Sequence, residues 1–98
     1  MSLPKLHKIK LREEFADAVL YGDKTFEVRQ NDRGYQKGDL VQFIVIDECQ
    51  LTIGHPLTKE TYRITYVLNG WGIDPKFVVF GIKNVRGVAI ENTDKQKI

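Results

Sequence analysis

Residues 22–34 read GDKTFEVRQNDRG, and the rest of the chain can be organised around this stretch. A helical pattern ends just before it, and strict alternation of side-chain types then begins. Successive side chains of a strand point to opposite faces, so Phe26 and Val28 share one face, while Glu27 and Arg29 share the other. The alternation therefore predicts a strand in which Phe26 and Val28 face the core and the two charged side chains face away from it.

The whole-chain composition is that of one ordinary globular domain. The chain has 98 residues, of which 42% are hydrophobic and 29% are charged, and its formal net charge is +2. The single cysteine, Cys49, excludes an internal disulfide framework and fits a reducing compartment. No apolar run approaches the roughly 18 residues of a membrane-spanning helix. We therefore expect one cytoplasmic domain over residues 1–98 with no membrane partner, and the mild positive charge permits an anionic partner.

Short apolar runs separated by turn signals predict five or six strands and one principal helix. The run over residues 40–46 is apolar on both faces, so it should be a central strand, and closure of the sheet is the simplest way to bury it. The sequence therefore predicts an α+β fold, a small, mostly closed β-barrel of mainly antiparallel strands with the helix flanking it. The expected strands are residues 6–11, 25–30, 40–46, 60–68 and 77–82, with residues 84–90 as a sixth, before a frayed polar tail from Glu91.

The helix is expected at residues 12–21 and should pack one apolar stripe on the strands. At the spacing i, i+4, i+7 and i+8, this stripe consists of Leu11, Phe15, Ala18 and Val19. Gly22 is well placed to end the helix.

Alternation also assigns faces to the other strands. In the first strand, Lys8 and Lys10 should face water. They can extend a basic surface near the cleft, but simple solvation of strand lysines is the preferred interpretation. Period two places Tyr62 and Tyr66 together on the core face of a later strand. A lone tryptophan in a small barrel usually packs, so the first expectation for Trp71 is a core or rim position.

The central stretch resembles a known domain signature. Gly22, Lys24, Glu27 and Arg29 match the G-x-K-x-x-E-x-R pattern of the ASCH domain, which belongs to the PUA-like barrels. The continuation through Arg33, with the later Gly-Asp pair at residues 38–39, resembles a compact bacterial and phage subgroup of uncharacterised function. The resemblance covers roughly residues 6–83. It implies a PUA-like β-barrel whose cleft lies beside the helix and is lined by the signature, in a superfamily that is generally taken to bind RNA or nucleotides.

The resemblance also raises an enzymatic alternative. Some ASCH proteins hydrolyse an acyl group from a modified cytidine, using a lysine at the position of Lys24 and a threonine three residues later. This sequence has Glu27 in the threonine position, so the family's nucleophile is missing from its slot. An enzyme built on this sequence would rely on Lys24 as base or electrostatic stabiliser and on Glu27 for proton transfer.

The first functional prediction is a non-catalytic module that binds RNA or a nucleotide. Arginine side chains can bind a phosphate through two parallel hydrogen bonds, and lysine adds a point charge. A glutamate can accept a hydrogen bond from a base edge. Recognition of single-stranded RNA also needs a stacking surface, for which Trp71 is the first candidate and Tyr35 the second. The predicted ligand-binding residues are Lys24, Glu27, Arg29, Asn31, Arg33 and Trp71.

Two further readings remain open. The charged cluster can be an ion network that only closes one end of the barrel, and the cleft can instead bind a protein partner. His7, Cys49 and His55 are the metal-ligand types present outside the carboxylates, but no two of them have a recognised ligand spacing. We therefore expect no metal and no cofactor.

Overall fold

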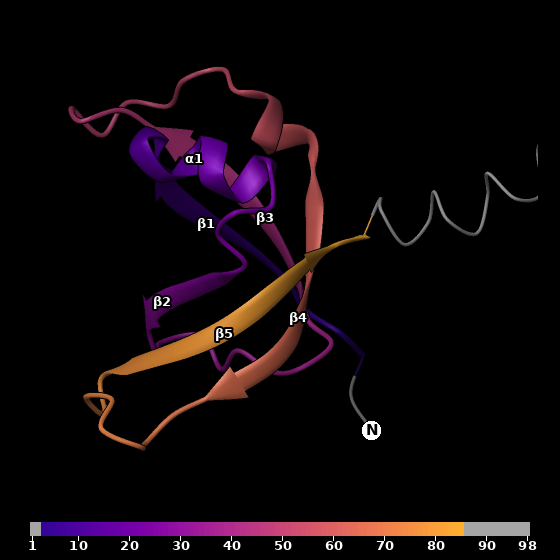
Figure 1. Cartoon of the computed structure of the whole chain (residues 1–98), viewed down its shortest axis with the longest axis vertical. Coiled ribbons are helices and arrows are strands. Elements are labelled where there is room, and N and C mark those ends of the chain that lie inside the picture. The colour runs from indigo at the N-terminus through magenta and orange to yellow at the C-terminus, as the bar shows by residue number, and fades with distance from the viewer. Residues whose placement is uncertain (1–2, 86–98) are drawn as a thin grey trace, which may run out of the picture.

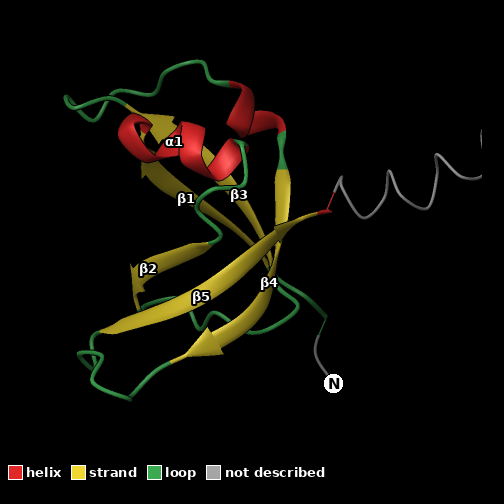
Figure 2. Cartoon of the chain, viewed as in Figure 1, coloured by secondary structure: helices red, strands yellow, loops and turns green. Residues whose placement is uncertain are grey.

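The computed structural model describes residues 3–85 as a small α+β domain (Figures 1 and 2). The further strand expected at residues 84–90 lies, after residue 85, outside the described residues, as does the tail from Glu91. In chain order the elements are β1 (Leu6–Arg12), α1 (Glu13–Leu20), β2 (Phe26–Gln30), β3 (Leu40–Ile46), a 3₁₀ turn η1 (Pro56–Lys59), β4 (Thr61–Leu68) and β5 (Phe77–Asn84).

The five strands form one sheet in the order β1-β3-β4-β5-β2. β1 pairs with β3 in parallel, and the other three pairings are antiparallel. The sheet curls into a half-barrel with α1 beside it (Figure 1). The expected five strands and flanking helix are confirmed. β3 is an interior strand between β1 and β4, buried on one face and half-buried along most of the other.

The expected closure of the barrel is not observed, because the two edge strands β1 and β2 do not pair with each other. Arg33, in the turn after β2, bridges the two edges instead, donating from Nη1 to the main-chain oxygen of Lys8 in β1 at 2.9 Å. We call this opening between β1 and β2 the seam.

Alternation along β1 follows the predicted faces. His7, Ile9 and Leu11 are buried, whereas Lys8 and Lys10 are exposed. The inner side chains of β1 join the core built mainly from β3, β4 and β5, whose largest fully buried members include Phe43, Phe80 and Ile64.

The helix ends where the sequence predicts. Gly22 has φ +86°, its N–H donates to the carbonyl of Val19, and the N–H of Asp23 donates to the carbonyl of Ala18. These paired bonds are the Schellman arrangement, which satisfies the last carbonyls of a helix. The predicted apolar stripe is right in part. Leu11 and Val19 are buried and Ala18 is half-buried, but Phe15 is 41% exposed, and Ala16 is buried in its place on the helix.

The faces of β2 are the reverse of the prediction. Glu27 is only 2% exposed, whereas Phe26 and Val28 are 46% and 55% exposed. Alternation fixes which residues share a face but not which face points inward, and here two neighbouring cations compensate the charge of the inward carboxylate.

Two aromatic residues lie outside the core against expectation. The register of β4 against β5 shifts between Ile64 and Tyr66, and this bulge leaves Tyr66 exposed while Tyr62 stays buried. Trp71 is 90% exposed in the β4–β5 loop with φ +54°, so the expected packing of Trp71 is wrong.

The buried Asp39 carboxylate ties the start of β3 to β1. It accepts hydrogen bonds from His7 Nε2 at 2.8 Å and from the backbone N–H groups of Lys5 and Gln36, both at 3.1 Å. Burial by itself would raise the pKa of Asp39, but the bond from His7 and the two backbone bonds outweigh it, so the pKa lies below its ordinary value of 3.8.

We predict that Asp39→Asn lowers the free energy of unfolding at neutral pH by about 1–3 kcal/mol, because it removes a charged acceptor from buried donors. A carboxylate with a depressed folded-state pKa stabilises the fold above its unfolded pKa, and that contribution is lost as the pH falls through the folded pKa. Urea unfolding should be measured at several pH values below about 5. As the pH falls over this range, the free energy of unfolding should decrease less in Asp39→Asn than in the unchanged protein. The exposed Asp23→Asn is the control, and an equal effect of both substitutions would contradict the role given to Asp39.

Candidate functional site

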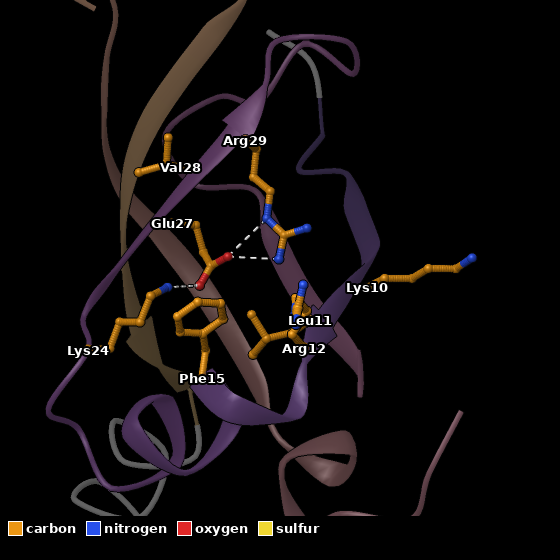
Figure 3. Close-up of a pocket in the computed structure, with 8 residues that line it drawn as sticks. All are labelled: Lys10, Leu11, Arg12, Phe15, Lys24, Glu27, Val28 and Arg29. Atoms are coloured by element: carbon orange, nitrogen blue, oxygen red, sulfur yellow. Dashed lines mark hydrogen bonds and ion pairs between the residues drawn. The ribbon is translucent and has the colours of Figure 1, made fainter. Parts of the chain in front are cut away.

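The centre of the site is the buried carboxylate of Glu27, which two cations hold from opposite sides (Figure 3). Lys24 Nζ lies 2.5 Å from Oε2, while Arg29 contacts Oε1 through Nε at 2.9 Å and Nη2 at 2.8 Å. The side chains of Lys24 and Arg29 keep about a fifth of their surface exposed, at 19% and 21%. The three residues form a half-buried cluster with one net positive charge, which we call the Glu27 cluster.

The turn after α1 positions Lys24 for this contact. Its backbone N–H donates to the carbonyl of Ala18 at 2.9 Å, alongside the bonds made by Gly22 and Asp23, so the chain leaves the helix in a fixed direction. Lys24 Nζ also donates to the carbonyl of Phe26 at 2.7 Å. It lies 5.7 Å from the ring centroid of Phe15, a favourable cation–π distance.

The Glu27 cluster forms one wall of a cavity of about 340 Å³ beside the helix, which we call the α1 pocket. Its lining comes from the end of β1, from α1 and from β2, so it spans the seam (Figure 3). The lining residues are Lys10, Leu11, Arg12, Phe15, Lys24, Glu27, Val28 and Arg29. In Figure 3 the side chain of Lys10 extends away from the cluster.

A second cavity, of about 390 Å³, lies further along the same seam, and we call it the turn pocket because the turn after β2 borders it. It shares Lys10 and Arg29 with the α1 pocket. Its lining residues are Lys8, Ile9, Lys10, Arg29, Gln30, Asp32, Arg33, Tyr35 and Ile44.

Positive charge is concentrated along the seam. Of the 15 lysines and arginines in the chain, six line the two pockets, against only two of the 13 aspartates and glutamates. The remainder of the chain therefore carries nine basic and eleven acidic residues, a formal excess of negative charge. A small net charge for the whole chain thus hides a strongly cationic surface at one place.

The structure brings together only part of the predicted site. Lys24, Glu27 and Arg29 meet in the α1 pocket, and Arg33 lines the adjoining turn pocket. Asn31 and Trp71 line neither of these two pockets. Their roles in binding stay predictions.

Tyr35, the second candidate for stacking a base, is buried, with only 6% of its surface exposed. Its ring makes tilted contacts with those of His7 and Phe80, with both centroid distances at 4.7 Å, so little of it is open to a base. Burial raises the pKa of the Tyr35 phenol, against the opposing influence of Arg33 and Arg29, so the hydroxyl stays protonated at neutral pH.

Sequence reasoning missed several pocket residues. The sequence predicts Phe15 in the core and Arg12 in the helix without a site role. For Lys8 and Lys10 it favours plain exposure to solvent over a basic surface near the cleft, and both line the pockets. The lysines are exposed as predicted, but the sheet order places their strand opposite β2. The sequence also contains an alternative apolar stripe of Ala16, Val19 and Leu20 at helical spacing. Choosing this stripe would have placed Phe15 outside the core, where it could be considered a site residue.

Metal ligands, the single cysteine and membrane-spanning helices are further features that can indicate a function. Among residues 3–85, no group of three or more histidine, cysteine, aspartate or glutamate side chains is arranged to hold a metal ion. Cys49 is exposed and free. The helices of the described part of the chain are all too short or too polar to cross a bilayer.

Residues 6–82 match a protein family described as a domain of unknown function, DUF3850, and the chain belongs to this family. The matched span contains every residue that lines the α1 and turn pockets. The chain is also similar to a protein of Escherichia phage P2 described as an uncharacterized 12.9 kDa protein in the GpA 3′ region, with 43% identity over 37 residues. That match covers 38% of this chain and 34% of the phage protein, so it spans about a third of its relative.

We predict that Glu27→Gln lowers the free energy of unfolding by about 1–3 kcal/mol, because it leaves Lys24 and Arg29 without their shared counter-charge. The matched control is Glu14→Gln, which removes an exposed ion pair with Arg12 at 2.9 Å and should change stability by less than about 1 kcal/mol. Urea unfolding monitored by circular dichroism measures both. Equal effects of the two substitutions would mean that the Glu27 cluster does not hold the fold together.

Proposed function

We propose that the protein is a non-catalytic binding module for RNA or a nucleotide, with the seam as its binding surface. The observation that carries the proposal is the excess of six cationic over two acidic side chains in the linings of the α1 and turn pockets. The proposal includes membership of the PUA-like, ASCH-type barrels, which is supported by the G-x-K-x-x-E-x-R spacing and by a half-barrel with one flanking helix.

Arg29 is the side chain best suited to contact a phosphate. Glu27 occupies its Nε and Nη2 atoms, while Nη1 has no partner among residues 3–85. A guanidinium held on one edge by a carboxylate is already oriented, so less side-chain entropy is lost when its other edge binds an oxygen. Arg33 is similarly fixed through its bond to the Lys8 carbonyl. These two arginines border the same pocket.

The hydrolase alternative is disfavoured by the hydrogen bonds of Glu27. Both carboxylate oxygens already accept from Lys24 or Arg29, so proton transfer to or from a substrate would first require one of these bonds to break. We expect no product when the protein is incubated with a panel of acyl-modified nucleosides and analysed by chromatography. Turnover that disappears in Lys24→Ala would establish the enzyme instead.

We predict that Lys8→Ala/Lys10→Ala weakens binding to a short, mixed-sequence single-stranded RNA and makes the binding less sensitive to salt. Each phosphate contact contributes about 0.7 to the slope of log affinity against log salt for single strands, so losing two contacts should reduce the slope by about 1.4. Fluorescence anisotropy with labelled RNA at several salt concentrations measures this slope. Both lysines are exposed, so neither replacement should disturb the core.

The matched control is Lys37→Ala/Lys59→Ala, which removes two exposed positive charges outside both pockets. It should leave most of the affinity and the slope unchanged. If the control weakens binding as much as Lys8→Ala/Lys10→Ala, the seam is not the binding surface. If the unchanged protein binds no RNA and no nucleotide, the proposal fails and protein partners become the alternative.

A further inference from the structure

The α1 pocket and the turn pocket adjoin, since both are lined by Lys10 and Arg29, yet their chemistry differs. We infer that they form one two-part site for a nucleoside that carries a phosphate, with the base in the α1 pocket and the phosphate in the turn pocket. This inference rests on the proposed function and specifies which unit of a nucleic acid the seam recognises.

The α1 pocket suits a base because its walls combine apolar surface with hydrogen-bond donors. Leu11, Phe15 and Val28 supply the apolar part, and Phe15 keeps 41% of its surface exposed. Splayed bases of single-stranded RNA are recognised by aromatic contact and by hydrogen bonds to their edges. Because both oxygens of Glu27 are occupied, Lys24 and Arg29 present donors, which fit the carbonyl oxygens and ring nitrogens of a base.

The turn pocket suits a phosphate because four of its nine lining residues are cationic and only Asp32 is acidic. The closest approach of Asp32 to Arg33 is 3.9 Å, at exposed side chains, so this pair neutralises Arg33 little. Arg33 is bonded to the opposite edge strand through the Lys8 carbonyl, which keeps its guanidinium at the seam. A charge-assisted bond to a phosphate is among the stronger hydrogen bonds available to it.

Arg29 joins the two parts because it is the arginine that lines both pockets. Its contact with Glu27 fixes the guanidinium on the side of the α1 pocket. A ligand with its base beside Phe15 would therefore present the attached phosphate toward Arg29 and Arg33. The same chemistry is offered by a free nucleotide and by a nucleotide unit within a strand.

The test uses NMR titration of the isotope-labelled 98-residue chain with the common ribonucleosides, their 5′-monophosphates and inorganic phosphate. At least one monophosphate should bind roughly tenfold or more tightly than its nucleoside, since a charge-assisted hydrogen bond contributes this much or more. Inorganic phosphate alone should bind more weakly than that monophosphate. Trinucleotides with and without a terminal phosphate distinguish a free nucleotide from a unit within a strand. If affinity requires the terminal phosphate, the site binds a free nucleotide or a strand end. If affinity is the same without it, the site binds an internal unit.

Two variants should separate the two parts of the site. Arg33→Gln should remove most of the preference for the monophosphate over the nucleoside while leaving nucleoside affinity unchanged. Phe15→Ala should weaken nucleoside and monophosphate by the same factor and so leave their ratio unchanged. Lys59→Gln, an exposed charge removal outside both pockets, should change neither quantity. The same spectra report whether each variant is folded.

The inference is overturned if nucleoside and monophosphate bind equally, if Arg33→Gln leaves their ratio unchanged, or if inorganic phosphate binds as tightly as the monophosphate. Failure of every mononucleotide, together with salt-sensitive RNA binding that depends on Lys8 and Lys10, would overturn the two-part site and leave the proposed function standing. Failure of RNA as well would overturn both.

Discussion

The burial of one carboxylate is the constraint on which the site depends. Glu27 points into an opening between two unpaired sheet edges, where an isolated charge would be too costly to desolvate. Lys24 and Arg29 must therefore lie on either side of it, and the turn after α1 and the alternation of β2 deliver them there. The spacing of the signature follows directly from this requirement, because the lysine approaches from before the strand and the arginine from two residues further along it.

The same constraint links the stability of the fold to the proposed binding role of the Glu27 cluster. The contacts that neutralise Glu27 also orient the outer edge of Arg29, so one set of bonds supports the fold and prepares a cationic surface. A purely structural network would need no further cations nearby. Lys8, Lys10 and Arg33 gather along the seam nonetheless, while the rest of the chain is formally acidic. This uneven distribution favours a ligand-binding role over closure of the sheet alone.

Periodicity predicted the elements of this fold well because hydrophobic alternation is a local property. The five strands and the interior position of β3 follow from it, and the glycine that ends α1 is likewise a local signal. The failures concern properties that neighbours decide. Which face of β2 is inner depends on the cations beside Glu27, and the exposure of Tyr66 depends on a bulge against β5. Lys24, Glu27 and Arg29 could be grouped from the sequence because they lie on one short segment. Lys8 and Lys10 could be predicted to face water but not to face the cluster, because only the order of strands in the sheet places them opposite β2. Phe15 was missed because the helical spacing favoured a core position for it.

The sheet order also has a consequence for how the domain folds. Strands β1 and β2 occupy opposite ends of the sheet, and both pair with strands distant in sequence, as in Leu6 with Leu40 and Phe26 with Gly81. Only the antiparallel neighbours β3, β4 and β5 follow one another along the chain. Pairings between distant segments carry the larger loop-closure entropy and tend to form late. The pockets along the seam therefore exist only once both edge strands are in place. A partly folded chain that lacks β1 or β2 has neither pocket and so cannot bind a ligand there.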